Sequence, residues 1–313
     1  AGRYLPEFRK IRSQNKNFIE LCLNSNLSSE ITLQPLKRFN LDAAIIFSDI
    51  LMVPFALGQE VKFLKNKGPD LSLFKLKSFL SNNEDNFAQK LNPVYEAIKI
   101  TRKKLNNDKS LISFIGAPWT LAVYMLGLKI EKNKIDFNKT LKLESEIKIV
   151  LDIICKYLFL HIEKQIEAGA DIVQIFDSWA GLIPEDKVHE YCYEPNRKIV
   201  EFCKKLGVPV ICFPKGIKKN YLQFANIVNP DCLSLDYDID PFWARDHLNN
   251  FCLQGGMNPE ILFKEENEIF NEVDKYLNIF KDHSYIFNLG HGLLPETDPN
   301  VLHKVVERVN NFK

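Results

Sequence analysis

The feature that most constrains this fold is a regular alternation of short apolar runs with helical segments. Each run has the length of a buried parallel strand, and almost every run ends in a polar or glycine-rich tip. The predicted strands span residues 43–47, 111–115, 171–176, 208–213, 232–235, 251–254 and 284–289. One predicted helix begins at Pro118. The other predicted helices span residues 143–168, 184–206, 221–228, 241–249, 265–281 and 299–312. This order predicts an α/β fold, either a (β/α)8 barrel or a doubly wound sheet.

The strand tips favour the (β/α)8 barrel of the TIM type. In such a barrel the loops after all strands share one active-site face, which explains why the tips are polar. A dinucleotide-binding sheet would instead need GxGxxG after the first strand, where this chain has Ser48-Asp49-Ile50. No change of composition marks a linker, so we expect one domain over residues 1–313, with an N-terminal arm and helices. The eighth strand is not evident.

Two segments lie outside this alternation. The first forty residues are helical after a polar opening, with one helix over 17–24 and another capped by Ser28 or Ser29, running towards Phe39 and kinked at Pro35. Residues 61–92 are rich in Lys and Asn, and we expect loops there with one helix near 73–80.

Composition excludes several classes of function. Forty-one basic and forty acidic residues give a net charge of +1, which offers no support for nucleic-acid or membrane binding. No apolar run has the roughly 20 residues of a membrane span, and the amino end does not resemble a secretory signal. The seven cysteines are scattered, mostly in apolar contexts, and we expect reduced core residues of a cytoplasmic protein. Because CxxC, HExxH and HxC pairs are absent, a zinc site is not expected.

Asp49 is the first candidate site residue, because it follows the first predicted strand, where barrel ligands bind. It could equally cap the turn that follows. Arg3, Arg9, Lys10 and Arg12 form a basic opening segment, either a solvated face or an arm that folds over an acidic ligand.

Five motifs, in this order and at these spacings, resemble the uroporphyrinogen decarboxylase family. They are Ala1-Gly-Arg-Tyr-Leu-Pro-Glu-Phe-Arg9, Leu41-Asp-Ala-Ala-Ile-Ile-Phe-Ser-Asp-Ile-Leu51, Gly116-Ala-Pro-Trp-Thr120 with Tyr124, Phe176-Asp-Ser178 with Ala180-Gly181, and Asn288-Leu-Gly-His-Gly292. The resemblance covers essentially the whole chain. It implies a barrel that is usually a homodimer, a carboxy-lyase of haem biosynthesis that uses no cofactor and no metal. Such an enzyme converts the four acetate side chains of uroporphyrinogen III to methyl groups, giving coproporphyrinogen III.

The chemistry explains why the family needs these residue types. Loss of CO2 from an acetate leaves electrons that a protonated pyrrole ring can accept, so the substrate supplies its own electron sink. By resemblance Asp49 is the carboxylate that faces the pyrrole N–H groups and stabilises the cation. Arg3 binds a substrate carboxylate and shares the catalytic role, with Arg12 as a companion. The remaining implied substrate-binding residues are Ala1 and Gly2 of the arm, Phe114, Gly116 and Phe176 of the walls, and Tyr124, Ser178 and His291 as polar contacts.

Alternatives remain open at several positions. Tyr124 could be ordinary helix packing and Ser178 a helix cap, whereas His291 between two glycines is hard to explain as a core residue. Lys215, His189 and His247 are interpreted as surface or core residues.

Two other functions compete with the decarboxylase. The family usually has Arg-Gln before Ala-Gly-Arg, and this Arg, often proposed as a proton donor or carboxylate anchor, is absent from the sequence, which begins at Ala1. A porphyrinogen-binding protein without turnover is therefore one alternative. The other is a zinc- and corrinoid-linked methyltransferase of the same superfamily, which would need an HxC pair where this chain has Val210 two residues before Cys212. We favour the enzyme.

Overall fold

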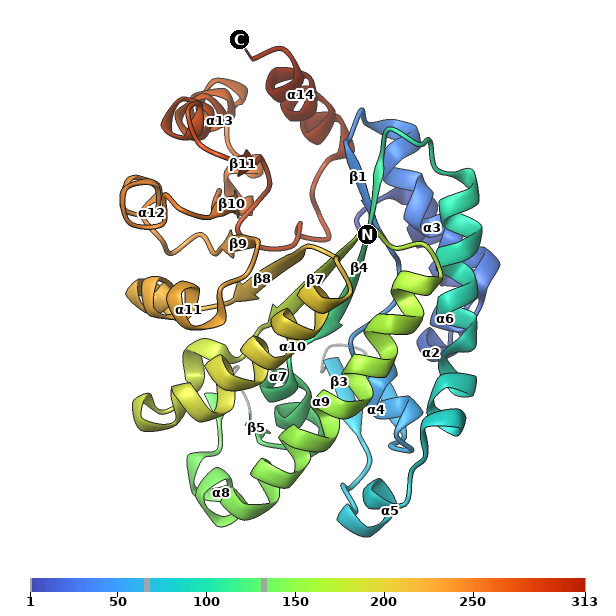
Figure 1. Cartoon of the computed structure of the whole chain (residues 1–313). Helices are drawn as coiled ribbons and strands as arrows, with labels where there is room; N and C mark the ends of the chain where they lie inside the picture. Colours follow the sequence, from blue (N-terminus) through green and yellow to red (C-terminus); the bar gives the residue numbers. More distant parts are fainter. Residues whose placement is uncertain (1, 65–67, 131–133, 313) are drawn as a thin grey trace.

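The central element of the computed structural model, which describes residues 2–64, 68–130 and 134–312, is a curled sheet of seven parallel strands (Figure 1). Its strand order is β1-β4-β7-β8-β9-β10-β11. The strands are β1 Ala43–Ile45, β4 Ser110–Gly116, β7 Ile172–Asp177, β8 Val210–Pro214, β9 Cys232–Leu235, β10 Cys252–Gly255 and β11 Tyr285–Ile286. Every residue of β8 and β9 is buried, as expected for strands covered on both faces.

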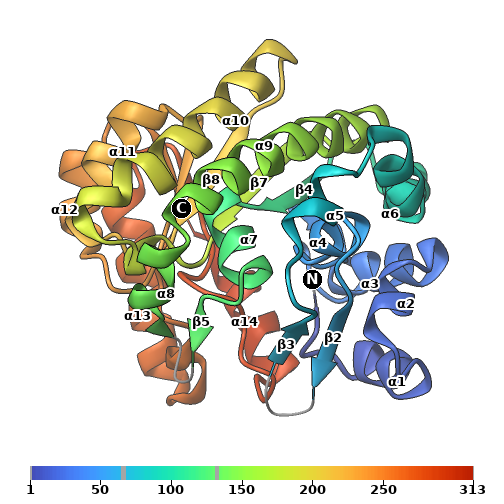
Figure 2. The ribbon, with the colours of Figure 1, turned by 90° about the horizontal axis from the view of Figure 1, so that it is seen from below.

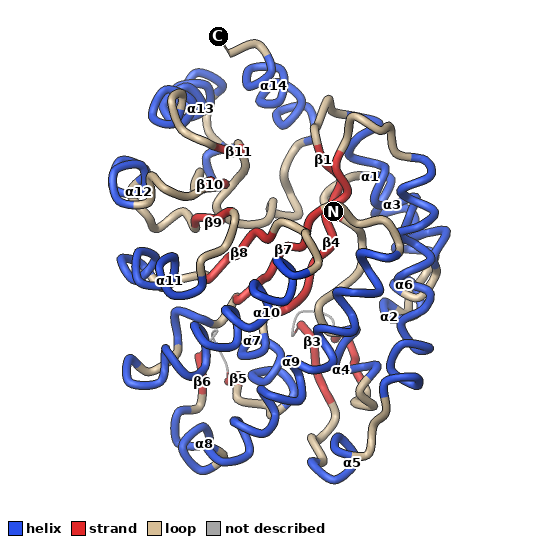
Figure 3. Tube along the Cα trace, viewed as in Figure 1, coloured by secondary structure: helices blue, strands red, loops and turns tan. Residues whose placement is uncertain are grey.

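Helices cover the outer side of the curled sheet (Figure 3). The α-helices are α1 Pro6–Gln14, α2 Phe18–Cys22, α3 Ser25–Arg38, α4 Met52–Ala56, α5 Leu76–Leu80, α6 Glu84–Lys104, α7 Pro118–Met125, α8 Phe137–Lys142, α9 Glu144–Glu167, α10 Glu194–Lys205, α11 Tyr221–Val228, α12 Pro241–His247, α13 Glu266–Phe280 and α14 Pro299–Asn310. The predicted α/β barrel class is confirmed. Among the described residues the main sheet has seven strands, and no pairing joins β11 to β1.

The C-terminal segment lies against the amino end of the fold. Asn310 Nδ2 donates a hydrogen bond to Asn40 O at 3.1 Å, and Arg9 donates one to the carbonyl of Pro295. The ring centroids of Phe39 and His303 are 6.3 Å apart. These contacts place α14 beside β1 in Figure 1, so the first and last helical segments flank the same edge of the sheet.

The apolar runs predicted the strands and most later helices to within a few residues. The bounds of β9 and α11 coincide with those predicted, and α13 and α9 are each one residue shorter at both ends. The first strand is shorter than predicted, ending at Ile45, although Ile46 N still donates to Ile112 O at 2.9 Å.

The predictions for residues 61–92 and for the opening segment were partly wrong. Strands β2 Val61–Leu64 and β3 Gly68–Leu71 form an antiparallel pair, here called the β2–β3 hairpin, and α6 begins at Glu84. The Asn83 side chain caps α6 by accepting from Asn86 N at 2.8 Å, a signal hidden by the polar composition. The polar opening also contains α1, which begins at Pro6.

Two further helix predictions were wrong in detail. Asn24, not Ser28 or Ser29, caps α3 by accepting from Leu27 N at 3.1 Å. The continuous helix predicted over 184–206 is instead a 3₁₀ turn at Glu185–Lys187, a π-helical turn at His189–Tyr193 and then α10. A π-helical turn inserts one extra residue into a helix, so apolar periodicity alone cannot locate it.

One hydrophobic cluster runs through the fold, from Tyr4 to Val305. All seven cysteines are free and six are buried, but Cys252, which was expected in the core, is only half-buried. Among the helices of the described residues, none combines the length and apolar character that crossing a bilayer requires.

Candidate active site

The carboxyl ends of the parallel strands form one face of the fold, which we call the barrel mouth. It comprises residues 48–50, 116–118, 177–179, 214–216, 236–238 and 287–292. Below it lies a layer of inward aromatic side chains. Asp177 faces the helices, where it accepts from Thr120 and Asn196, so the preceding Phe176 faces inward, and Phe213 pairs in register with Phe176. The ring centroids of Phe114 and Phe176 are 5.7 Å apart, and those of Phe176 and Phe213 are 6.3 Å apart. A flat apolar molecule at the mouth would rest on this layer.

Asp49 lies at the mouth directly after β1, and both of its oxygens have partners. Oδ1 accepts a hydrogen bond from Leu51 N at 3.0 Å, and Oδ2 lies 3.2 Å from the Arg3 guanidinium. The turn-capping interpretation therefore holds for one oxygen, while the other belongs to an ion pair. Because the side chain is still 13% exposed, the carboxylate remains open to a ligand.

The N-terminal arm holds Arg3 over Asp49. The guanidinium also donates to Ser48 O at 3.2 Å and lies 5.1 Å from the Phe18 ring and 5.7 Å from the Phe47 ring. Half of the Arg3 side chain is exposed, so its remaining N–H groups can reach an anion at the mouth. Helix α2 packs on β2, since the ring centroids of Phe18 and Phe63 are 4.5 Å apart, and Figure 2 shows α1, α2 and β2 on the same side of the fold.

Gly2 and Arg12 of the opening segment make contacts within the fold. Gly2 is buried, and a Cβ there would stand 2.6 Å from Leu5 Cδ1, so a larger residue would require the Leu5 side chain to move. Arg12 donates to Asn15 O at 2.6 Å and Lys16 O at 2.9 Å at the end of α1, although its guanidinium also lies over Phe18, 5.5 Å from the ring. Ala1 lies outside the described residues.

Tyr124 lies on the second turn of α7, half-buried near the mouth. Burial raises its pKa, a hydrogen bond with Trp179 lowers it, and the charge of Asp49 raises it again. Trp179 is itself anchored to α7, since its N donates to Thr120 Oγ1 at 3.3 Å and its carbonyl accepts from Trp119 Nε1 at 3.2 Å. The pair therefore ties α7 to the tip of β7, where the exposed Ser178 precedes Trp179.

Asp177 was not predicted as a site residue, yet it organises this tip from behind. Its Oδ1 accepts from Thr120 at 2.7 Å and its Oδ2 from Asn196 Nδ2 at 3.1 Å. Burial raises the pKa of Asp177 to about 6. The side chain joins β7 to α7 and α10, and thereby fixes the backbone that carries Ser178.

His291 lies at the tip after β11, exposed at the rim of the mouth. Desolvation lowers its pKa first, and the nearby Lys215 cation lowers it further. The preceding residue, Gly290, allows two backbone segments to pack closely, because a Cβ at Gly290 would stand 2.5 Å from Tyr237 N. Gly116 likewise permits packing, since its Cβ would stand 2.9 Å from Leu121 Cδ2 and 3.1 Å from Ile50 Cβ.

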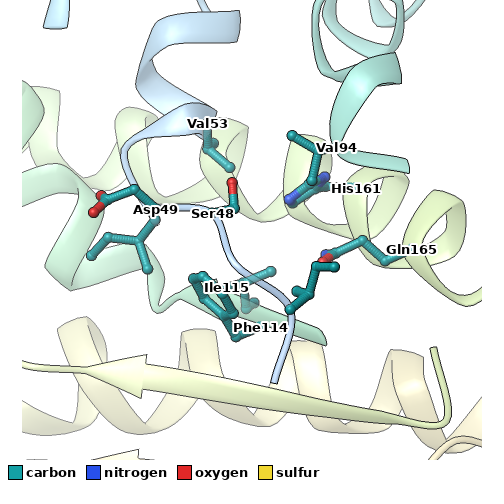
Figure 4. A pocket seen from close by; sticks show the side chains of 10 residues that line it. Ser48, Asp49, Val53, Val94, Phe114, Ile115, His161 and Gln165 are labelled. Atoms are coloured by element: carbon teal, nitrogen blue, oxygen red, sulfur yellow. The ribbon is translucent and has the colours of Figure 1, made fainter. Parts of the chain in front are cut away.

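A small internal cavity lies behind the mouth, between the sheet and the helices (Figure 4). Ser48 and His161 point into it, while Asp49 points away towards the mouth. Its volume is about 10 Å³, room for no more than a water molecule. His161 is buried there beside Tyr95, with 3.1 Å between Tyr95 Oη and His161 Nδ1, and desolvation lowers its pKa to about 3. This cavity cannot hold a macrocycle, so the open mouth is the candidate site.

The described residues contain no group of three or more His, Cys, Asp or Glu side chains placed to hold a metal. Cys212 is buried, and because Phe213 faces inward, Cys212 faces the helix layer. Its electrostatic neighbours include Cys203 of α10, and burial raises the pKa of its thiol well above the usual value.

Comparisons with known proteins agree over the full length. The family model described as uroporphyrinogen decarboxylase (URO-D) matches residues 1–312. The chain is 41% identical to the uroporphyrinogen decarboxylase of Rickettsia bellii over 319 residues, which cover 100% of this chain and 93% of the relative. It is 35% identical to that of Jannaschia sp. over 317 residues, 99% of this chain and 92% of the relative. Among solved structures, a methyltransferase from Methanosarcina mazei superposes with a TM-score of 0.78 at 18% identity, covering 96% of this chain and 90% of that one, which indicates a shared fold.

Proposed function

The chain belongs to the uroporphyrinogen decarboxylase family, and on that premise we propose that its barrel mouth decarboxylates uroporphyrinogen in haem biosynthesis. The finer assignment is a carboxy-lyase that converts the four acetate arms of uroporphyrinogen III to methyl groups. The observation that carries this proposal is the Asp49–Arg3 pair above the aromatic layer. It offers an anion for the centre of a macrocycle, a cation for its rim and an apolar floor.

We assign Asp49 to the centre of the macrocycle. A porphyrinogen is flexible enough to direct its pyrrole N–H groups to one side, where a carboxylate can accept them. Protonation of a pyrrole α-carbon gives a cationic ring, and the nearby negative charge stabilises that cation. Because the hydrogen-bonded turn to Leu51 already fixes Asp49, little reorganisation accompanies the reaction.

The reaction then needs no external electron acceptor. The bond between the acetate CH2 and its carboxylate breaks, CO2 leaves, and the bonding electrons neutralise the cationic ring. A second proton adds to the exocyclic carbon to form the methyl group, and the ring α-carbon loses its extra proton. Each decarboxylation consumes one proton and releases one CO2. Only the acetate arms are placed to feed the ring, so the propionates are spared.

The surrounding residues bind the periphery of the substrate in this proposal. Arg3 pairs with a carboxylate, and Arg12 stiffens the same cluster through Phe18. Tyr124, Ser178 and His291 donate hydrogen bonds to other arms, while Phe114 and Phe176 pack against the macrocycle. Ala1 and Gly2 complete the arm. We further propose a single-domain chain that forms a homodimer in the cytoplasm, as the family resemblance and the reduced cysteines favour.

The proposal is tested by anaerobic incubation with uroporphyrinogen III, followed by oxidation and chromatography that counts carboxyl groups per macrocycle. A four-carboxylate product is expected. An unchanged eight-carboxylate macrocycle that nevertheless binds would instead make this a binding protein.

A further inference from the structure

Lys215, expected from the sequence to be a surface or core residue, lies at the tip of β8. Phe213 belongs to the inward aromatic layer, and the next residue, Pro214, pairs in register with the outward Asp177. Alternation therefore returns Lys215 to the inner face, on the same level as Ser178. The side chain is half-buried at the mouth.

The backbone around Lys215 is held on every side. Its N donates to Asp177 O at 3.1 Å, and its carbonyl accepts from Gly181 N at 2.9 Å. Gly216 N donates to Asp236 Oδ2 at 2.7 Å. Gly181 packs so closely that a Cβ would stand 2.4 Å from Gly216 O. The tip is thus fixed before any ligand arrives, which reduces the entropy lost on binding.

The charge of Lys215, by contrast, is not matched within the described part of the chain, where it joins none of the ion pairs. The two acids beside it have other partners. Asp177 accepts from Thr120 and Asn196, and Asp236 accepts from Gly216 N and from Asp238 N, the latter at 3.1 Å. A half-buried cation on a rigid tip is therefore available to an external anion.

His291 lies beside this cation. Gly290 packs on the β9 tip, where a Cβ would stand 2.9 Å from Asp236 C, and Asp236 in turn binds the amide that follows Lys215. The proximity also shows in the pKa of His291, which the Lys215 charge lowers after desolvation. Two donors from the separate tips of β8 and β11 thus lie close to each other at the mouth.

We propose that Lys215, together with His291, binds a carboxylate arm of the macrocycle other than the arm that Arg3 holds. This inference rests on the proposed function, because uroporphyrinogen carries carboxylates all round its rim. Arg3 on the β1 side engages one part of that rim, and Lys215 engages the β8–β11 part. The bound group is either an acetate or a propionate, and the two are separable by experiment.

The test compares Lys215→Met, Lys215→Arg and the control Lys219→Met, which removes an exposed lysine four residues further along. For each protein, kcat and KM are measured with uroporphyrinogen III, and Kd is measured anaerobically for the eight- and four-carboxylate macrocycles. Lys215→Met is expected to raise KM and the eight-carboxylate Kd about tenfold, with kcat within about threefold of wild type. Lys215→Arg should restore binding to within about threefold, and Lys219→Met should resemble wild type.

The four-carboxylate macrocycle identifies the arm. If its Kd rises with Lys215→Met as well, Lys215 holds a propionate; if only the eight-carboxylate Kd rises, it holds an acetate. A melting temperature confirms folding, and Lys215→Gln replaces Lys215→Met should the latter unfold. Binding by the neutral variant within about twofold of wild type overturns the proposal. If wild type binds without turnover and Lys215→Met still weakens binding, the Lys215 site stands while the decarboxylase function falls.

Discussion

Asp49→Asn should leave the fold intact and remove most of the activity. The amide keeps an oxygen that can accept from Leu51 N, so the turn after β1 is preserved. The lost ion pair with Arg3 contributes only about 0–1 kcal/mol, because half of the Arg3 side chain is exposed to screening solvent. Unfolding by urea should therefore show a free energy within about 1 kcal/mol of wild type.

The effect on catalysis should be far larger. A neutral amide no longer stabilises the cationic macrocycle, and removal of one preorganised electrostatic group typically lowers kcat by about 10²–10³-fold. That loss corresponds to about 3–4 kcal/mol of transition-state stabilisation. Asp42→Asn is the matched control, because Asp42 is exposed just before the amino end of the same strand.

The assay is single-turnover decarboxylation of uroporphyrinogen, run beside the urea titration. If Asp49→Asn turns over within about threefold of wild type, the carboxylate does not stabilise the cation, and the reasoning fails. If stability and activity fall together by several kcal/mol, Asp49 is mainly a structural cap.

Three further results are expected. The pKa of His161 is about 3 in the folded state, below its ordinary 6.5, so the unfolded state binds more protons and stability falls as the pH falls. Between pH 7 and 4 the free energy of unfolding, measured by urea titration, should decrease by about 3 kcal/mol more for wild type than for His161→Gln. An equal pH dependence of the two proteins would contradict this. Gly181→Ala should lower the free energy of unfolding by about 2–3 kcal/mol, because the new Cβ would clash with Gly216 O. The control Gly207→Ala, whose Cβ meets open space, should lower it by about 1 kcal/mol. Equal losses in the two variants would argue against the close contact. Dialysis against a zinc chelator should leave decarboxylation unchanged, whereas activity lost and then restored by zinc would revive the methyltransferase-like site.

Local signals were sufficient to predict the later half of the fold. The run Cys232–Leu235 and the helix Tyr221–Val228 are apolar segments bounded by polar residues, so their limits are visible in the sequence. The hairpin β2–β3 was missed because long-range contacts support it. Gln59 Nε2 donates to Ser72 O at 2.8 Å and to Met125 O at 2.9 Å, and sequence position alone does not indicate that these groups meet.

The candidate site was likewise predictable where local sequence indicated it and was missed where long-range contacts form it. Asp49 was found because it follows a buried run, and its pairing with Arg3 places the basic opening segment at the mouth. Lys215 was missed although the alternation from Phe213 would have placed it inward. Asp177 also follows a buried run, within the motif Phe176-Asp-Ser178, but its role could not be predicted, because its partners Thr120 and Asn196 come from helices distant in the sequence.

The most direct test of the central claim is an anaerobic crystal structure with coproporphyrinogen III bound. We expect the pyrrole nitrogens about 3 Å from the Asp49 carboxylate, with the macrocycle on Phe114 and Phe176. A macrocycle bound with its nitrogens more than about 4 Å from Asp49, or with an arm rather than the ring facing that carboxylate, would contradict it.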